Sequence, residues 1–273
     1  MWHSAGAGRP STSRYGQLLS LLVLGTQVLA LATPQLQASV RSVADDDNHW
    51  VATWTSMPQE VEQSNLPPSP FVCSHPTQHI TRSRDTNAGV FAQGSGTMFK
   101  DATLRQTLHM SVGASRIRVQ FSNTFGGSDL AITGASIALP TGSKIGVNGI
   151  DTATLAGLTF KGGASSITIP RGQVAYSDAI DFTIAPQSML TVNMYLEGGQ
   201  SSNKITGHPG SRTTSWMQSG NHLNASTVTG ASTKHWYYVS VVEAWAPKNT
   251  TALVILGDSI TDGRGSDDDK NNR

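Results

Sequence analysis

Residues 257–263 combine residue types that could build a nucleophilic site around a serine. They read Gly257-Asp258-Ser259-Ile260-Thr261-Asp262-Gly263, and they follow an apolar, β-prone run at 253–256. A serine hydroxyl becomes an effective nucleophile only when a base removes its proton and hydrogen-bond donors stabilise the oxyanion. A buried strand would hold Ser259 on a rigid element, and Gly257 would let the chain turn sharply beside a substrate carbonyl. The pattern therefore predicts a buried strand that leads into a nucleophile turn.

The residues around Ser259 have expected roles in such a turn. If a helix begins at Ser259, its free N–H groups face the developing negative charge, and the N–H of Ser259 becomes one oxyanion donor. Asp258 and Asp262 are expected to brace the turn by accepting backbone hydrogen bonds. A second interpretation is that Ser259 is a plain helix N-cap, because Ser259 and Asp262 come close to a capping box. The apolar run and the complete seven-residue string favour the nucleophile.

This string, from Gly257 to Gly263, resembles the first signature block of the GDSL, or SGNH, family of serine esterases and lipases. Residues 103–106, 116–126 and 177–178 are also similar to the β-domain that precedes the catalytic domain in a secreted branch of that family. The resemblance implies a carboxyl-ester hydrolase in which Ser259 attacks an ester carbonyl and forms an acyl-enzyme. It also implies an ester substrate (an acylated small molecule, a lipid or an acetylated polysaccharide) and no cofactor.

The family completes its site with blocks that would follow Ser259 in the sequence. These blocks supply a glycine and an asparagine as oxyanion donors and an Asp-x-x-His as acid and base. Ten residues follow Gly263, so the resemblance implies a truncated hydrolase domain that is inactive by itself. An Asp-x-x-His also occurs at Asp46 to His49, ahead of the β-rich region, and we interpret it as a chance match.

His208 is a further histidine that could serve the site. It lies in the polar stretch 206–212 and is expected in a loop. There it could face an active-site mouth, but a loop histidine with ordinary hydrogen bonds is the favoured interpretation.

Alternating hydrophobicity predicts strands through most of the chain. Residues 116–121 read Arg-Ile-Arg-Val-Gln-Phe, so Ile117, Val119 and Phe121 are expected to face a core while the polar side chains face outward. Turn sequences rich in Gly and Pro separate the runs, and the sequence contains no convincing helix and no internal repeat. Short strands at this spacing predict a sandwich or jelly roll. The other expected strands are 50–55, 103–111, 130–139, 154–160, 165–169, 179–184, 189–196 and 234–244.

The sequence divides into consecutive parts with different expected structures. Residues 1–32 are expected to form a signal peptide, and residues 33–96 hold a polar N-terminal segment, the first strand and a Pro-rich loop. Residues 97–248 are expected to form the β-sandwich domain, and residues 249–273 the truncated start of the hydrolase domain. The predicted fold class is thus all-β, a β-sandwich or jelly-roll-like domain followed by the first strand and nucleophile turn of an α/β hydrolase domain.

The N-terminal residues indicate a secreted protein. Arg9 and Arg14 precede an apolar run at 18–32, which ends in the small-x-small site Ala30-Leu31-Ala32 and is typical of a signal peptide. A buried first helix or a signal anchor is the alternative. The run is too short and too interrupted by polar residues to favour a stable membrane span.

Two N-glycosylation sequons and the single cysteine are relevant to the expected secretion of the protein. Asn224 and Asn249 each begin an N-glycosylation sequon, which agrees with secretion. Cys73 is the sole cysteine, so it is either a free buried thiol or bonded to a partner elsewhere. Its Pro-rich surroundings argue against a catalytic role.

Composition and spacing exclude other classes of site. The formal net charge of +1 offers no electrostatic basis for binding nucleic acid. No histidine or cysteine spacing suits a metal site, and no metal is expected. The acidic stretch 267–269 lacks the glycine and closing glutamate of an EF-hand loop, so we expect a solvated surface loop there.

Aromatic residues raise a functional alternative. Rings on strands usually pack in a core, but exposed rings can stack on sugars. Exposed, coplanar tryptophans would favour a non-catalytic β-sandwich module that binds carbohydrate or cell wall, with the Ser259 segment as a vestige. Buried ones would favour a structural domain that packs against a catalytic partner. The aromatic residues concerned are Trp54, Trp216, Trp236, Trp245, Tyr237 and Tyr238.

Overall fold

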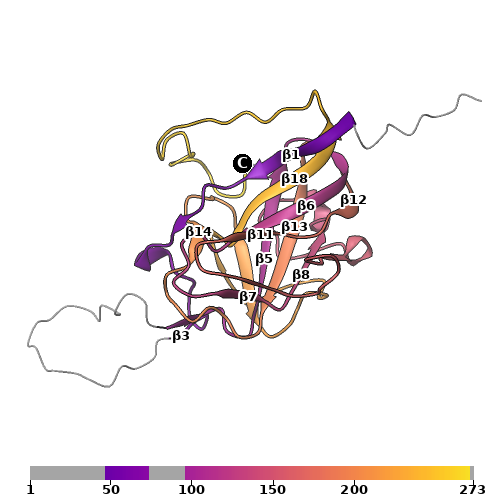
Figure 1. Ribbon diagram of the computed structural model, residues 1–273. Coiled ribbons are helices and arrows are strands. Elements are labelled where there is room, and N and C mark those ends of the chain that lie inside the picture. Colours follow the sequence, from indigo (N-terminus) through magenta and orange to yellow (C-terminus); the bar gives the residue numbers. More distant parts are fainter. Residues whose placement is uncertain (1–46, 74–95, 271–273) are drawn as a thin grey trace, which may run out of the picture. The chain divides into compact units, whose positions relative to one another are not determined.

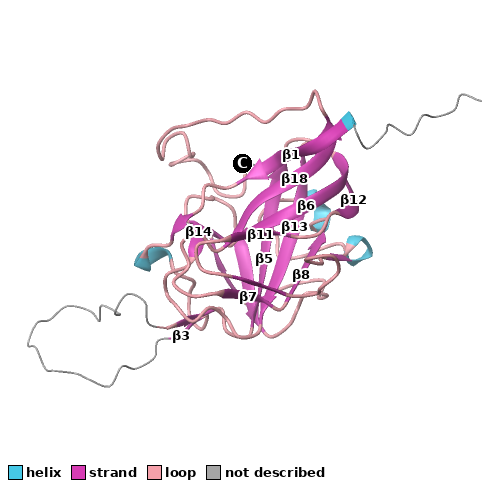
Figure 2. Ribbon diagram, viewed as in Figure 1, coloured by secondary structure: helices cyan, strands magenta, loops and turns pink. Residues whose placement is uncertain are grey.

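A computed structural model describes residues 47–73 and 96–270 of the chain (Figures 1 and 2). These residues form antiparallel strands joined by loops, which confirms the predicted all-β class. The expected signal peptide and Asp46 lie outside the described residues. Within the described ranges, no helix has the length and apolar character needed to cross a membrane. The short 3-10 helices are η2 (Gln63–Asn65), η3 (Thr141–Ser143) and η4 (Thr152–Thr154).

The first large sheet contains β1 (Asn48–Thr55), β6 (Ala114–Ser122), β11 (Val174–Tyr176), β12 (Ile180–Ile184) and β18 (Val239–Pro247). The strand order is β1-β18-β6-β11, and β12 also pairs with β6. The alternation predicted for β6 is confirmed, because Ile117, Val119 and Phe121 are fully buried. Arg116 and Arg118 lie on the outer face and form ion pairs there, as expected for the polar side of a half-buried strand.

The second large sheet contains β5 (Ala102–Met110), β8 (Gly134–Ala138), β9 (Ala156–Gly157), β13 (Ser188–Leu196), β15 (Ser215–Ser219) and β16 (Ala231–Thr233). Its strand order is β16-β15-β5-β13-β8-β9. Figure 1 shows β1, β18 and β6 running across β5, β13 and β8. Leu104 and Val192 of this sheet share one buried apolar cluster with Val119 of the first sheet. Burial of this shared core is the main force that holds the two sheets together.

Three smaller sheets surround the two large ones. The first contains β17 (Trp236–Tyr237), β14 (Thr206–His208) and β2 (Gln59–Glu60), in the order β17-β14-β2. The second pairs β10 (Ile167–Ile169) with β7 (Leu130–Ile132). The third pairs β3 (Val72–Cys73) with β4 (Thr97–Met98). The backbone of Cys73 therefore belongs to β3.

Several predicted strands are divided in the structure. The run expected at 130–139 becomes β7 and β8, because the chain leaves a small sheet at residue 133 and enters the second large sheet. The run expected at 234–244 is interrupted at Tyr238, whose φ of 64° cannot be part of a regular strand. The strands β14, β15 and β16 were not expected, because runs of three to five residues carry little periodicity.

Arg105 is buried on the face of the second sheet that is turned away from the shared core. Its guanidinium donates to Asn193 Oδ1, to the carbonyl of Asn148 and to the carbonyl of Ala225, each at 2.7 Å. Burial lowers the pKa of Arg105 to about 10, so the group stays charged at neutral pH. Because these donors meet acceptors, the charge is tolerated although none of the carboxylates in the described residues pairs with it. Arg105 thereby ties the loops at residues 148 and 225 to the sheet.

Candidate active site

The apolar run at 253–256 is extended but forms no strand. After β18 ends at Pro247, the chain runs through Leu253, Val254, Ile255 and Leu256, whose exposed fractions are 86, 87, 71 and 94%. Figure 2 draws this stretch as a loop. The predicted buried strand is therefore wrong for this structure. A strand needs a neighbour to satisfy its N–H and C=O groups, and none of the described strands pairs with this run.

Ser259 lies on an exposed turn and not at the start of a helix. The turn is closed by hydrogen bonds from the N–H of Asp262 to the Asp258 carbonyl (2.9 Å) and from the N–H of Arg264 to the Ser259 carbonyl (2.7 Å). Neither a helix dipole nor a helix N-cap therefore acts at Ser259. The bracing role expected for Asp258 is present, because its Oδ1 accepts from the N–H of Ile260 at 2.9 Å.

The two glycines of the motif have conformational reasons to be glycine. A methyl group added at Gly257 would collide with the side chain of Thr261, which folds back across the turn. Gly263 has a φ of 79°, in the left-handed region that disfavours residues with a Cβ atom. The turn thus depends on both residues, as the sequence pattern suggested for Gly257.

Asp262 contacts the β-domain through its side chain. Its Oδ1 lies 3.3 Å from Nε2 of His208, whose side chain is only 4% exposed. His208 ends β14, so the predicted loop position is wrong: Gly207 and His208 pair with β17. The imidazole has an ordinary hydrogen bond, as expected, between Nδ1 and the Met57 carbonyl at 2.9 Å.

The bond to Met57 decides which proton arrangement His208 prefers. A carbonyl only accepts, so Nδ1 carries the hydrogen, and the neutral ring then directs the lone pair of Nε2 toward the Asp262 carboxylate. That arrangement is unfavourable until Nε2 is protonated as well. The contact between the nucleophile turn and the β-domain is therefore strongest when His208 is charged.

Asp269 provides a second anchor for the same segment. Its carboxylate accepts from the N–H and the hydroxyl of Thr214, both at 2.7 Å, and from Nζ of Lys234 at 2.9 Å. Its own N–H donates to the Arg212 carbonyl at 2.8 Å. Partial burial raises the pKa of Asp269, but the hydrogen bonds from Thr214 and the charge of Lys234 outweigh it and leave the pKa below its usual value. The predicted solvated loop at 267–269 is therefore wrong for Asp269.

The chemistry open to Ser259 follows from its surroundings. Its side chain is exposed, and neither its hydroxyl nor its N–H has a hydrogen-bond partner within residues 47–73 and 96–270. The N–H is thus available as one oxyanion donor. No described side chain is hydrogen-bonded to the hydroxyl as a general base, so the described residues do not form a nucleophile–base pair at Ser259.

The remaining predicted residues are distributed over the β-domain. Asn224 and Asn249 are both exposed in loops, as an N-glycosylation acceptor requires. Trp54 and Trp236 pack edge to face in the core, with centroids 4.9 Å apart and planes at 87°.

The core-packing interpretation is confirmed for most of the aromatic set. Tyr237 and Tyr238 are buried along with Trp54 and Trp236, while Trp216 and Trp245 are half-buried. Within the described part of the chain, no cluster of His, Cys, Asp and Glu could hold a metal ion.

Sequence reasoning missed the two anchors of the C-terminal segment. Asp262 and Asp269 reach His208, Thr214 and Lys234 across 35 residues or more of sequence. No local pattern signals such contacts, because each depends on how the segment returns to the β-domain. No protein-family model matches this chain, and no curated protein matches it either.

Proposed function

We propose that the chain belongs to a secreted carboxyl-ester hydrolase of the GDSL/SGNH type, with Ser259 as the nucleophile and its N–H as one oxyanion donor. The observation that carries the proposal is the string from Gly257 to Gly263. It is supported by a turn in which the hydroxyl and N–H of Ser259 are both exposed and unpaired within the described residues. The expected signal peptide and the exposed sequons at Asn224 and Asn249 support secretion.

The proposed reaction is a two-step acyl transfer. The Ser259 oxygen attacks the ester carbonyl while a base takes its proton, and the alcohol leaves with a proton returned by that base. Water then attacks the acyl-enzyme, releases the acid and restores the serine hydroxyl. The substrate is an acylated small molecule, a lipid or an acetylated polysaccharide, and no cofactor takes part.

Hydrolysis of p-nitrophenyl acetate by this 273-residue chain tests the proposed incompleteness of the site. We expect no turnover above that of Ser259→Ala, because the described residues provide no base at the hydroxyl. Turnover that is lost in Ser259→Ala would contradict the inactivity of the chain, while supporting the nucleophile.

A carbohydrate- or cell-wall-binding module remains the alternative function. The buried Trp54 and Trp236 give no support to a tryptophan platform, and they agree better with a structural domain that packs against a catalytic partner. Pull-down on insoluble neutral polysaccharides separates these alternatives, because only a carbohydrate- or cell-wall-binding module is retained.

A further inference from the structure

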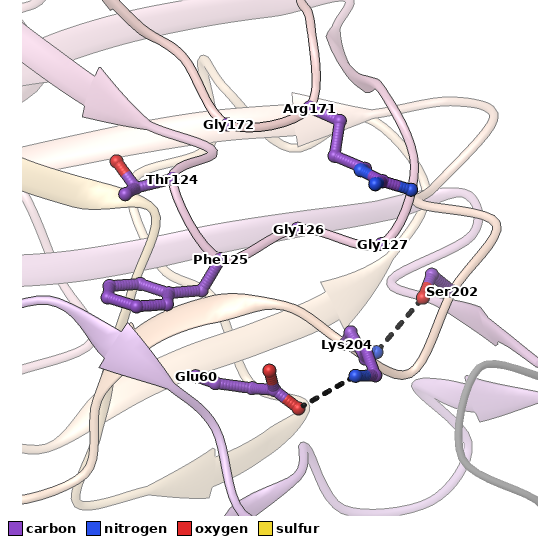
Figure 3. Close-up of a pocket in the computed structure, with 9 residues that line it drawn as sticks. All are labelled: Glu60, Thr124, Phe125, Gly126, Gly127, Arg171, Gly172, Ser202 and Lys204. Atoms are coloured by element: carbon purple, nitrogen blue, oxygen red, sulfur yellow. Dashed lines mark hydrogen bonds and ion pairs between the residues drawn. The ribbon is translucent and has the colours of Figure 1, made fainter.

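A polar hollow of about 440 Å³ opens between loop segments of the β-domain, well separated in sequence (Figure 3). One wall is the turn after β6, which carries Thr124 and Phe125. The others come from β2, from the turn between β10 and β11, and from the loop before β14. The charged, hydroxyl-bearing and aromatic side chains that line the hollow are Glu60, Thr124, Phe125, Arg171, Ser202 and Lys204.

A buried amide pair fixes the walls of this hollow. Asn123 and Gln200 are fully buried, and Gln200 Nε2 donates to Asn123 Oδ1 at 2.7 Å. The amide of Asn123 also donates to the carbonyls of Ser128 and Ile169, both at 2.9 Å. Because these bonds connect separate segments, the hollow is preformed and needs little ordering on binding.

The floor of the hollow is bare backbone. A methyl group added at Gly126 would collide with Asn123, and one added at Gly127 would collide with Ser202. The N–H groups of the floor are already used, since Gly126 donates to the Asn123 carbonyl at 3.1 Å and Gly127 to the Lys204 carbonyl at 2.8 Å. A ligand can therefore approach closely, but it must be recognised by side chains.

Two cations face the hollow. Arg171 is exposed, and its guanidinium has no hydrogen bond or ion pair within the described residues. Lys204 Nζ lies 3.7 Å from Glu60 Oε1, with side chains 40 and 39% exposed, so the two groups form a weak ion pair at the surface. Figure 3 shows Arg171 on one side of the Gly126–Gly127 backbone and the Lys204–Glu60 pair on the other.

Phe125 adds an aromatic face at the rim. Its ring is 39% exposed, and its N–H is fixed by a 2.9 Å hydrogen bond to Thr206 Oγ1. An exposed ring beside hydroxyl and carboxylate groups suits the apolar face and the hydroxyl edge of a sugar. Glu60 can accept from ligand hydroxyls, and the hydroxyls of Thr124 and Ser202 lie on the same surface.

We propose that this hollow binds an acidic sugar, with the ligand carboxylate on Arg171, its ring against Phe125 and its hydroxyls on Glu60. A planar guanidinium matches a carboxylate in a bidentate arrangement. A phosphate fits less well, because the backbone N–H groups of the floor are occupied and Glu60 would repel a second negative charge. The proposal is independent of ester hydrolysis at Ser259.

Isothermal titration calorimetry of the full chain at low salt tests this site. The probes are tetragalacturonate and a glucuronic acid tetramer, each compared with a neutral galactose tetramer. We expect at least one acidic tetramer to bind, and the neutral tetramer to bind about tenfold more weakly or not at all. Added salt weakens the acidic ligand, because part of its binding is electrostatic.

Variants locate the binding within the hollow. Arg171→Gln and Phe125→Ala should each weaken binding of the acidic tetramer about tenfold, with unchanged thermal unfolding because both side chains are exposed. Arg116→Gln is the matched control, since it removes an exposed arginine from the outer face of β6 and should leave binding unchanged. The proposal is overturned if neither acid binds, if the neutral tetramer binds as tightly, or if Arg171→Gln has no more effect than Arg116→Gln.

Discussion

Arg105 shows how a single side chain links distant parts of this chain. Its guanidinium reaches β13 through Asn193 and two loops through the carbonyls of Asn148 and Ala225. Ala225 is part of the sequon that begins at Asn224, so the same arginine shapes the backbone of an expected glycosylation acceptor. The burial of Arg105 could not be predicted from the sequence, because an arginine in an alternating strand normally faces water.

Replacing Arg105 with lysine is expected to destabilise the fold by about 2–4 kcal/mol, because an ammonium cannot reach all four acceptors and leaves buried oxygens unpaired. Urea unfolding measures this change. The control Arg116→Gln removes an exposed arginine and should alter the free energy of unfolding by less than about 0.5 kcal/mol. Equal effects of the two substitutions would show that the buried network adds nothing.

Ser259 shows the limit of a motif at the residue scale. The string from Gly257 to Gly263 correctly indicates the polar turn, the Asx-type bond of Asp258 and the need for glycine. The partner of Asp262 could not be predicted, because His208 lies far away in sequence and meets it only through the return of the chain.

The elements differ in how far their own sequence determines them. The strand β6 was predictable because one of its faces is buried and the other is exposed to solvent. Apolar and polar residues therefore alternate along its sequence. The run at 253–256 has the same β-prone composition, yet it stays unpaired and exposed. Strand formation depends on a neighbouring edge, and local composition cannot supply one.

The C-terminal segment is anchored at Asp262 and Asp269, and the anchor at Asp269 responds to pH. Asp269 has a lowered pKa when docked, so its contribution is complete above its ordinary pKa of about 4 and is lost as the pH falls through the lowered value.

Hydrogen-exchange protection of residues 259–264, corrected for the intrinsic rate, should therefore be complete above pH about 4 and fall as the pH drops below that value. Asp269→Asn should reduce protection at every pH above about 4, because it removes a charged acceptor of Thr214 and Lys234. Protection that does not change as the pH falls well below about 4, or wild-type protection in Asp269→Asn at neutral pH, would refute the pH-dependent anchor.

At the scale of the whole molecule, the β-domain has its own apolar core, and the exposed run at 253–256 adds nothing to it. The all-β class was predictable from alternation and turn residues across the chain. The arrangement of strands into two large sheets was not, since order such as β16-β15-β5-β13 depends on pairings between distant segments.

Ending the chain after Thr251 should leave the β-domain folded. The truncation removes the anchors at Asp262 and Asp269 and the long pair of Asp268 with Lys234, so we expect the melting temperature to fall by no more than about 4 °C. Circular dichroism during heating measures this, and the far-UV β signal should be unchanged. Loss of cooperative unfolding would mean that the C-terminal segment is part of the folded core.

Covalent labelling tests the role of Ser259 most directly. A fluorophosphonate probe is added to the folded product of the native gene, and the modified residue is found by mass spectrometry. We expect one adduct, on the peptide containing Ser259, which disappears in Ser259→Ala. An unlabelled Ser259 in a folded product, or the same adduct yield in Ser259→Ala, would contradict its assignment as the nucleophile.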